Sequence, residues 1–256
     1  MTSQFPQSIA PIYLPCDMVA QLPTPTELTP AVIYPDSDGQ PMADNTKQFR
    51  WIMVIHHNLD WLFDHDPLVF VAGDLLWYPV EGNNKIRQAP DVMVIFGVEK
   101  GDRGSYQQWK EGNIAPQVVF EILSPGNTLL EMSRKQAFYD RYGVEEYYIY
   151  DPDRNDLMGW QRRETTLVPI EEMAGWVSPR LGIQFNPQEP ELELLRPDGT
   201  PFASYRELNQ QLETMEQQLG VIEQELEAER QRGDRLAQRL RELGLDPEAP
   251  EASNTD

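Results

Sequence analysis

The stretch from Pro116 to Asn127, PQVVFEILSPGN, constrains the fold more than any other part of this 256-residue chain. Its apolar residues follow one another without the alternation of a half-exposed strand, which is typical of a strand buried on both faces. Glu121 stands in the middle of this run, and an unpaired carboxylate in such a place is costly. The sequence therefore predicts a layered fold with a buried acid that needs a partner.

Helix and strand signals alternate around this strand. Helices are predicted over residues 45–66 and 128–143, and further strands over residues 68–80, 90–98, 145–152, 157–163 and 165–170. In the first helix one stripe is predicted to face the core, formed by Phe49, Ile52, His56, Leu59 and Phe63. A leading helix, three strands, a second helix and more strands predict an α/β fold with one central mixed sheet flanked by helices.

Composition divides the chain into four regions. Residues 1–41 contain eight prolines and form a predicted extended N-terminal arm. Residues 42–203 carry the α/β domain, which a short strand and a Pro-Asp-Gly turn close. Residues 204–243 are rich in Gln, Glu, Arg and Leu, and residues 244–256 have a composition typical of disorder.

Region 204–243 contains a heptad pattern of apolar residues at alternating steps of four and three: Leu208, Leu212, Met215, Leu219, Ile222 and Leu226. The same steps continue through Glu229 and Gly233, a polar break, to Leu236, Leu240 and Leu243. This pattern predicts a coiled coil formed by a homodimer or with a coiled-coil partner. The alternative is a helix that packs back on the body.

Composition also limits where the chain acts and what it binds. A single cysteine, Cys16, excludes an intramolecular disulfide, and the sequence contains neither a secretion signal nor a run of 18 apolar residues. We therefore expect a cytoplasmic protein without membrane contact. The formal net charge of −21 disfavours general binding to nucleic acid through phosphates.

Two acids suggest a metal site. Asp91 begins the predicted strand in APDVMVIFG, and Glu121 lies in the next predicted strand of the body. Carboxylates on neighbouring strands can meet at one point of a sheet and bind Mg²⁺ or Mn²⁺ through oxygen. Such an ion would remove the cost of burying Glu121.

The segments VAGDLLWYPVEG, APDVMVIFGV, FEILSPGNT and KQAFYDRYGVEEYYIYDP, followed by the Leu/Glu/Arg-rich tail, resemble the Putative restriction endonuclease family, a domain of unknown function expanded in photosynthetic bacteria. The resemblance covers roughly residues 30–243, in the same order. It implies a restriction-endonuclease-like core of the PD-(D/E)XK nuclease superfamily, which hydrolyses phosphodiester bonds with a divalent metal.

Carried over residue by residue, the resemblance makes Pro90-Asp91 the first part of the family motif and Glu121 its second acid. The expected acid-any-lysine triplet reads Glu121-Ile122-Leu123 here and contains no lysine. In this family a lysine from the following helix takes that place, which implies Lys135 as the third catalytic residue. Asp74 matches another family acid and is a candidate third metal ligand.

Each candidate also has a plainer interpretation. Asp91 could end a loop and accept backbone hydrogen bonds, and Glu121 could pair with an arginine. Lys135 alone would be a solvated helix residue, and Asp74 in a Gly-Asp turn is more often structural than a ligand. The adjacent residues His56 and His57 are expected to be one histidine at the edge of the core and one at the surface, rather than catalytic groups.

Two functions remain. The first is a metal-dependent endonuclease acting on DNA, with a local basic patch as the nucleic-acid contact, formed by Lys85, Arg87, Lys100, Arg103 and Lys110. The second is a catalytically degenerate nuclease-like fold that serves as a binding or scaffold module and assembles through its coiled coil. The acidic composition and the missing in-place lysine favour the second.

Overall fold

The computed structural model describes residues 32–188 and 190–244. The chain divides into two compact units, Met1–Ile33 and Tyr34–Asp256, and every described helix and strand belongs to the second. The predictions for most of the N-terminal arm, for Cys16 and for the tail from residue 245 lie outside the described residues.

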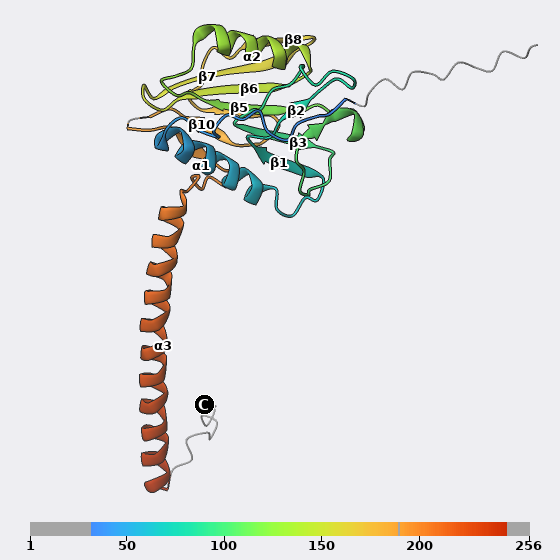
Figure 1. Cartoon of the computed structure of the whole chain (residues 1–256). Coiled ribbons are helices and arrows are strands. Elements are labelled where there is room, and N and C mark those ends of the chain that lie inside the picture. Colours follow the sequence, from blue (N-terminus) through green and yellow to red (C-terminus); the bar gives the residue numbers. More distant parts are fainter. Residues whose placement is uncertain (1–31, 189, 245–256) are drawn as a thin grey trace, which may run out of the picture. The chain divides into compact units, whose positions relative to one another are not determined.

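The predicted central mixed sheet is present and has six strands in the order β1-β3-β5-β6-β7-β8 (Figure 1). Only the central pair, β5 and β6, is parallel, because helix α2 (Leu129–Arg141) connects these two strands; the other neighbours are antiparallel. The strands span Val69–Gly73 (β1), Val92–Phe96 (β3), Val118–Ile122 (β5), Glu146–Asp151 (β6), Asp156–Arg163 (β7) and Thr166–Pro169 (β8).

Two small sheets and a short 3₁₀ helix complete the body. Strand β2 (Trp77–Tyr78) pairs in parallel with β4 (Tyr106–Gln107), which runs into the 3₁₀ helix η1 (Gln108–Lys110). Strands β9 (Trp176–Val177), β10 (Gln184–Asn186) and β11 (Glu193–Leu195) form an antiparallel sheet. The apolar segment 68–80 thus contains two strands, β1 and β2, which belong to two different sheets.

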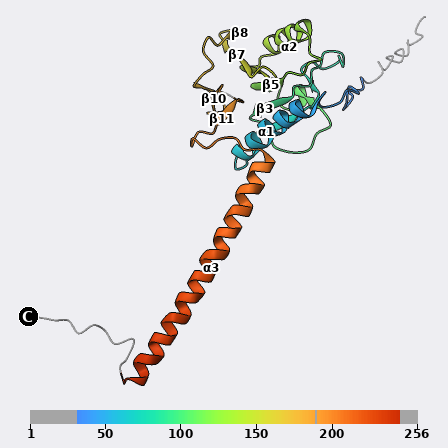
Figure 2. The ribbon, with the colours of Figure 1, turned by 90° about the vertical axis from the view of Figure 1, so that its left-hand side faces the viewer.

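The main sheet has a core on each face. Helix α1 (Thr46–Leu62) and β10–β11 pack on one face, and helix α2 and β2 pack on the other, so α1 and α2 lie on opposite sides of the strands (Figures 1 and 2). All five residues of β5 are buried, as its continuous apolar run predicts.

Both body helices have side-chain caps that explain where they start. The Asn45 carboxamide oxygen accepts the backbone N–H groups of Lys47 and Gln48, and the Thr128 hydroxyl accepts that of Glu131. Helix α2 ends before Gly143, whose φ of 92° suits glycine in the position after a helix C-cap.

The predicted buried stripe of α1 is confirmed at Ile52 and Leu59 but is wrong at Phe49. Phe49 is 44% exposed, whereas Gln48 and Asn58 are buried on the core side. Both polar residues have partners: Gln48 donates to the Ile122 carbonyl at 2.8 Å, and Asn58 donates to the Ala203 carbonyl at 2.9 Å. These hydrogen bonds offset the cost of burying the amides.

Helix α3 (Tyr205–Glu242) follows the body as one continuous helix of 38 residues. Ser204 and Glu207 form a capping box at its start, and none of its residues, all in the described part of the chain, is buried. No helix of the described chain is both long enough and apolar enough to span a bilayer.

Candidate functional site

Strand β5 presents Glu121 to the face of the sheet that α2 covers. Neighbouring residues of a strand point to opposite faces, so Glu121 shares this face with Val119 and not with Phe120. The Glu121 residue is only 2% exposed. The sequence prediction of a buried carboxylate in the middle of the sheet is confirmed.

Pro90 explains why Asp91 lies beside Glu121. The pairing of β3 with β5 matches Val92 with Phe120, and the next hydrogen-bonded pair would join Pro90 with Ile122. Proline has no N–H for that pair, and the Pro90 carbonyl is already the acceptor of the Asp74 N–H at 3.1 Å.

Side chains replace the missing backbone pair. Asp91 Oδ2 accepts the Ile122 N–H at 2.6 Å, and Gln48 Nε2 donates to the Ile122 carbonyl at 2.8 Å. The Pro90-Asp91 dipeptide therefore ends the β3–β5 ladder and places the Asp91 carboxylate next to Glu121, across neighbouring strands.

Helix α2 supplies two donors to Glu121. Lys135 and Tyr139 are one turn apart, so both side chains can reach the same acid. Lys135 Nζ lies 2.7 Å from Oε2 of Glu121, and the Tyr139 hydroxyl donates to Oε1. The structure thus brings together the three residues predicted as catalytic, and the ion-pair partner of Glu121 is a lysine rather than an arginine.

Burial dominates the electrostatics of this cluster. It raises the pKa of Asp91 well above the usual aspartate range, and the negative charge of Glu121 raises it further. Burial also raises the pKa of Glu121, although Lys135 opposes this effect. Burial lowers the pKa of Lys135, but the carboxylates of Glu121 and Asp91 outweigh it, so the net shift is upward and the amine stays charged.

Asp74 lies near this cluster but in a different setting. It follows β1 in a left-handed backbone conformation, with φ of 48°, and its side chain is exposed. Partial burial raises its pKa, and the charge of Asp38 adds to the shift, while Lys135 opposes it. The charges of the cluster therefore influence the pKa of Asp74. Its role as a third metal ligand stays a prediction.

The sequence analysis did not identify Tyr139 and Tyr147, two buried tyrosines that lie next to each other on the α2 face of the sheet. Their ring centroids are 5.0 Å apart, yet only Tyr139 has a hydroxyl partner. The Tyr147 hydroxyl is buried and has no hydrogen-bond partner among the described residues. The spacing of Lys135 and Tyr139, four positions apart in a helix, was the signal in the sequence that could have identified the second donor.

The donor atoms and the charge of the cluster suit a hard divalent cation. The three acids of the cluster, Asp91, Glu121 and Asp74, carry three formal negative charges, and Lys135 carries one positive charge. The atoms with which these acids could bind a metal are all carboxylate oxygens. In the described part of the chain no three acidic, histidine or cysteine side chains lie together as a group that could hold a metal ion. Two carboxylates completed by water and phosphate are a common way to bind Mg²⁺.

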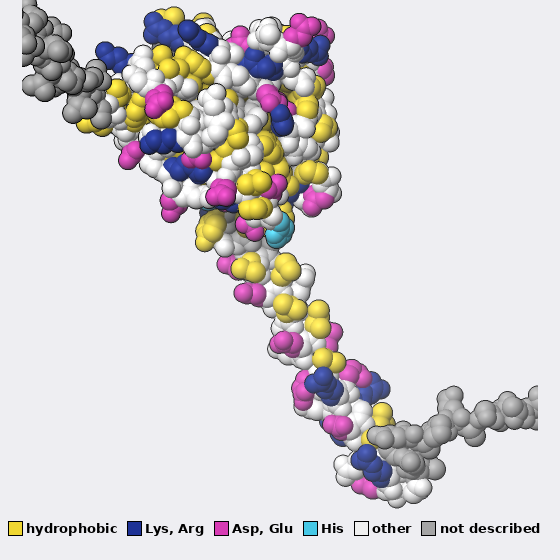
Figure 3. Space-filling model, turned by 90° about the vertical axis from the view of Figure 1, so that its right-hand side faces the viewer, with side chains coloured by type: hydrophobic (Ala, Val, Ile, Leu, Met, Phe, Trp, Pro, Cys, Tyr) yellow, Lys and Arg dark blue, Asp and Glu magenta, His cyan; other side chains and the backbone are white. Residues whose placement is uncertain are grey.

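The residues of the predicted basic patch differ in how available they are. Lys85 and Lys110 are exposed, whereas Arg103 is held by Glu111, with Nε 2.8 Å from Oε1, and lies over the ring of Phe70. Lys100 Nζ donates to the Phe63 carbonyl at 2.8 Å, and Arg87 donates to the Asn84 carbonyl at 3.4 Å. On the face in Figure 3, basic and acidic side chains are interspersed over the body.

The two adjacent histidines lie on helix α1. The half-buried His56 has a pKa lowered by burial and by the neighbouring His57, and its ring lies against Gly73. Asp91 and Glu121, by contrast, share the α2 face. We therefore assign the histidines no part in the site.

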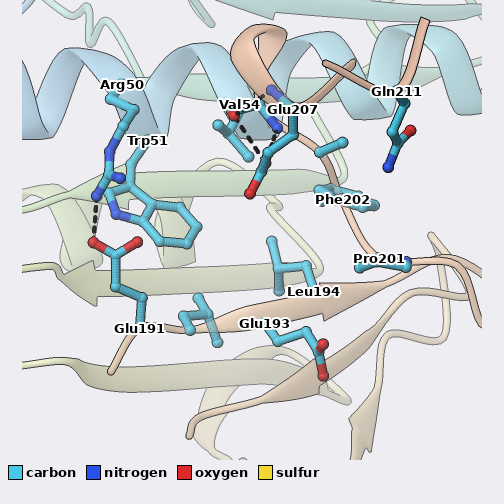
Figure 4. A pocket seen from close by; sticks show the side chains of 13 residues that line it. Arg50, Trp51, Val54, Glu191, Glu193, Leu194, Pro201, Phe202, Glu207 and Gln211 are labelled. Atoms are coloured by element: carbon cyan, nitrogen blue, oxygen red, sulfur yellow. Dashed lines mark hydrogen bonds and ion pairs between the residues drawn. The ribbon is translucent and has the colours of Figure 1, made fainter. Parts of the chain in front are cut away.

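A separate pocket of about 370 Å³ lies on the α1 face of the sheet (Figure 4). Trp51 and Leu194 line it, and the ion pair of Arg50 with Glu191 closes one side. Glu207, from the capping box of α3, borders it as well. Because Glu121 faces the other side of the sheet, this pocket is not part of the carboxylate cluster.

A comparison with protein-family models agrees with the resemblance seen in the sequence. The model of the Uma2 family, described as "Putative restriction endonuclease", matches residues 41–187, more than half of the chain. A crystal structure of a putative nuclease belonging to DUF820 from Anabaena variabilis ATCC 29413 is similar, with a TM-score of 0.41 and 14% sequence identity, over 55% of this chain and 74% of that one. No curated protein matches.

Proposed function

Because the chain belongs to the Uma2 family of restriction-endonuclease-like proteins, we propose that it is a metal-dependent endonuclease that hydrolyses phosphodiester bonds of nucleic acid, with DNA as the substrate. One observation carries the proposal: a lysine from α2 reaches the buried Glu121 at 2.7 Å, beside the second buried acid, Asp91. The lysine that is missing from the triplet Glu121-Ile122-Leu123 is supplied from the next helix.

In this proposal Asp91 and Glu121 would hold Mg²⁺ or Mn²⁺ together with water and phosphate, and Asp74 is the candidate for a third ligand. A bound divalent ion would supply positive charge for the scissile phosphate and lower the pKa of a bound water. Lys135 orients the attacking water and stabilises negative charge as it develops, and Tyr139 fixes the Glu121 carboxylate.

Binding of the substrate is assigned to the predicted basic patch. The exposed Lys85 and Lys110 are available to contact phosphates, and Arg87, Lys100 and Arg103 are the half-buried members of the patch. With a net charge of −21 the protein needs such a local contact, and we expect its binding to weaken steeply with salt. The single cysteine fits action in the reducing cytoplasm.

The partner assigned to α3 is a second copy of the chain or another coiled-coil protein. Its heptad residues are exposed along the whole helix, and α3 has no buried residue of its own. A helix of this polarity and length gains most of its stability by packing such a stripe against another helix.

A second function is kept because of two observations. The body is acidic, and Lys135 is already engaged by Glu121, with its side chain 14% exposed. Both fit a catalytically degenerate fold that serves as a scaffold and in which the Lys135–Glu121 pair only stabilises the core.

Cleavage assays distinguish these two functions. Plasmid and short duplex and single-stranded DNA are incubated at low salt with Mg²⁺, with Mn²⁺ or with EDTA. The proposal expects cleavage only with metal, and its loss in Asp91→Asn and Glu121→Gln, while the matched control Asp156→Asn, an exposed acid on β7, retains it.

Calorimetric titration of Mn²⁺ provides a readout that does not require turnover. The wild-type chain and Asp156→Asn should bind the ion, and Glu121→Gln should not. Wild-type protein that neither binds Mn²⁺ nor cleaves any of these substrates would support the scaffold. Cleavage by Asp91→Asn at the wild-type rate would refute the ligand assignment.

A further inference from the structure

The apolar stripe of α3 is exposed along its whole length, and yellow side chains follow one another along this helix in Figure 3. Each residue on the stripe is between 37% and 75% exposed, namely Leu208, Leu212, Met215, Leu219, Ile222, Leu226, Leu236, Leu240 and Leu243. In heptad terms, Leu212, Leu219, Leu226, Gly233 and Leu240 occupy a positions, and the other stripe residues, with Glu229, occupy d positions.

The polar break in this stripe disfavours a parallel homodimer. In a parallel pair of identical helices each core residue meets its own counterpart. Glu229 would then face the Glu229 of the other copy, which places two like charges in one core layer, and Gly233 would face Gly233, which leaves a gap.

The flanking charges point to the opposite orientation. The e and g positions of the first half of α3 carry Glu216, Glu223 and Glu225, and those of the second half carry Arg230, Arg232 and Arg239. Residues at e and g positions select the partner and its orientation through ion pairs. An antiparallel arrangement places the acidic half of one helix beside the basic half of the other.

We propose that α3 binds the α3 of a second copy of this chain in antiparallel orientation, with core residues whose numbers add up to 455 facing each other. This register places Leu219 opposite Leu236, and the small Gly233 opposite the large Ile222. Glu229 then faces Leu226 instead of another carboxylate. The inference rests on the proposed self-association of α3 and is independent of nuclease activity.

The charges define this register. It pairs Glu223 with Arg230 and Glu225 with Arg232, each pair twice because of the two-fold symmetry. A shift of one heptad in one direction would place Glu223 opposite Glu223 and Glu225 opposite Glu225. A shift in the other direction would place Arg230 opposite Arg230 and Arg232 opposite Arg232. The parallel alternative would form only the pair of Glu225 with Arg230.

Disulfide cross-linking of the full-length chain tests the orientation. Leu219→Cys and Leu236→Cys are made separately in a Cys16→Ser background and then mixed by unfolding and refolding. In the proposed register residues 219 and 236 are neighbours, whereas identical positions of the two copies lie about 26 Å apart along the axis. We expect a cross-linked dimer from the mixture and none from either variant alone. Cross-linking of each variant alone would show a parallel pair and overturn the inference.

A second measurement covers the case in which the leucine substitutions weaken the helix. A spin label at Gln210→Cys, on the face of α3 opposite the stripe, leaves the core intact. Electron–electron distance measurement should give about 50 Å in the antiparallel dimer, because identical positions are 35 residues apart along the axis. A short distance indicates parallel helices, and a monomer mass by light scattering shows that α3 does not self-associate; either result overturns the inference.

Discussion

Lys135 Nζ lies 2.7 Å from Oε2 of Glu121, although 14 positions separate the two residues along the chain. The pair links α2 to the central strand β5, and both side chains are largely shielded from solvent. A buried pair of this kind loses much of its stability when one partner is removed, because the other charge stays behind. Function and stability therefore have to be measured side by side in variants of this site.

Lys135→Ala should lower metal-dependent cleavage by about 100-fold or more, since loss of one group that stabilises charge in the transition state commonly costs that much. The matched control is Arg134→Ala, which removes an exposed cation from the adjacent position of α2 and should leave the rate within about two-fold. Rates are measured well below the melting temperature of each variant. Equal rates for Lys135→Ala and wild type would rule out a catalytic role.

Asp91→Asn should stabilise the metal-free protein at neutral and alkaline pH. The pKa of Asp91 is raised in the folded state. The contribution of Asp91 to the free energy of unfolding is therefore fully present below its unfolded pKa of about 3.9, and it is lost as the pH rises through the folded pKa. Asparagine stays neutral, and its side-chain oxygen can still accept the Ile122 N–H.

Urea denaturation in EDTA at pH 4 and pH 8 measures this difference. The variant should be more stable than wild type at pH 8, because it carries no charge that the buried site penalises. The gain should shrink toward pH 4. A variant that loses stability at pH 8 would show that the Asp91 charge is compensated in the folded state.

Tyr139→Phe and Tyr147→Phe form a matched pair of substitutions in neighbouring buried rings. Loss of the Tyr139 hydroxyl leaves Oε1 of Glu121 without its donor and should cost about 1–3 kcal/mol. Loss of the Tyr147 hydroxyl, which has no described partner, should be neutral or stabilising. Chemical denaturation of the two variants checks the order, and a greater loss in Tyr147→Phe would contradict it.

Substitutions in the basic patch should separate binding from stability. Lys85→Ala combined with Lys110→Ala should lower the slope of log affinity for DNA against log salt by about two, one for each lost phosphate contact, without a change in melting temperature. Arg103→Ala should instead cost about 1–3 kcal/mol of stability, since its guanidinium is bound to Glu111 and packed on Phe70. An unchanged salt slope in the double variant would place the DNA contact elsewhere.

Much of the fold was predictable because the central strands are buried on both faces and give apolar runs without alternation, as β5 does on either side of Glu121. The phase of α1 was not predictable in the same way. Gln48 and Asn58 are polar by composition but buried, and their partners, the carbonyls of Ile122 and Ala203, are far away in sequence. Hydropathy alone therefore places the exposed Phe49 on the wrong side of the helix.

The candidate site was predictable in its residues but not in its contacts. Resemblance to the family indicated Asp91, Glu121 and Lys135, and the structure brings them together. The hydrogen bond between Asp91 and the Ile122 N–H depends on the strand register, which places Pro90 opposite Ile122 and is not visible in the sequence. Short strands such as β4 and β9 carry too few residues for a periodic pattern.

The hydrogen bond from the Ile122 N–H to Asp91 has a consequence for the history of such chains. The Asp91 carboxylate takes the place of a backbone carbonyl at the point where Pro90 interrupts the ladder. It therefore helps to hold β3 and β5 together whether or not the protein cleaves nucleic acid. A descendant that lost catalysis would still benefit from an acceptor at this position. An aspartate after this proline is thus a poor marker of activity when sequences are surveyed, because drift would remove it more slowly than a residue that serves chemistry alone.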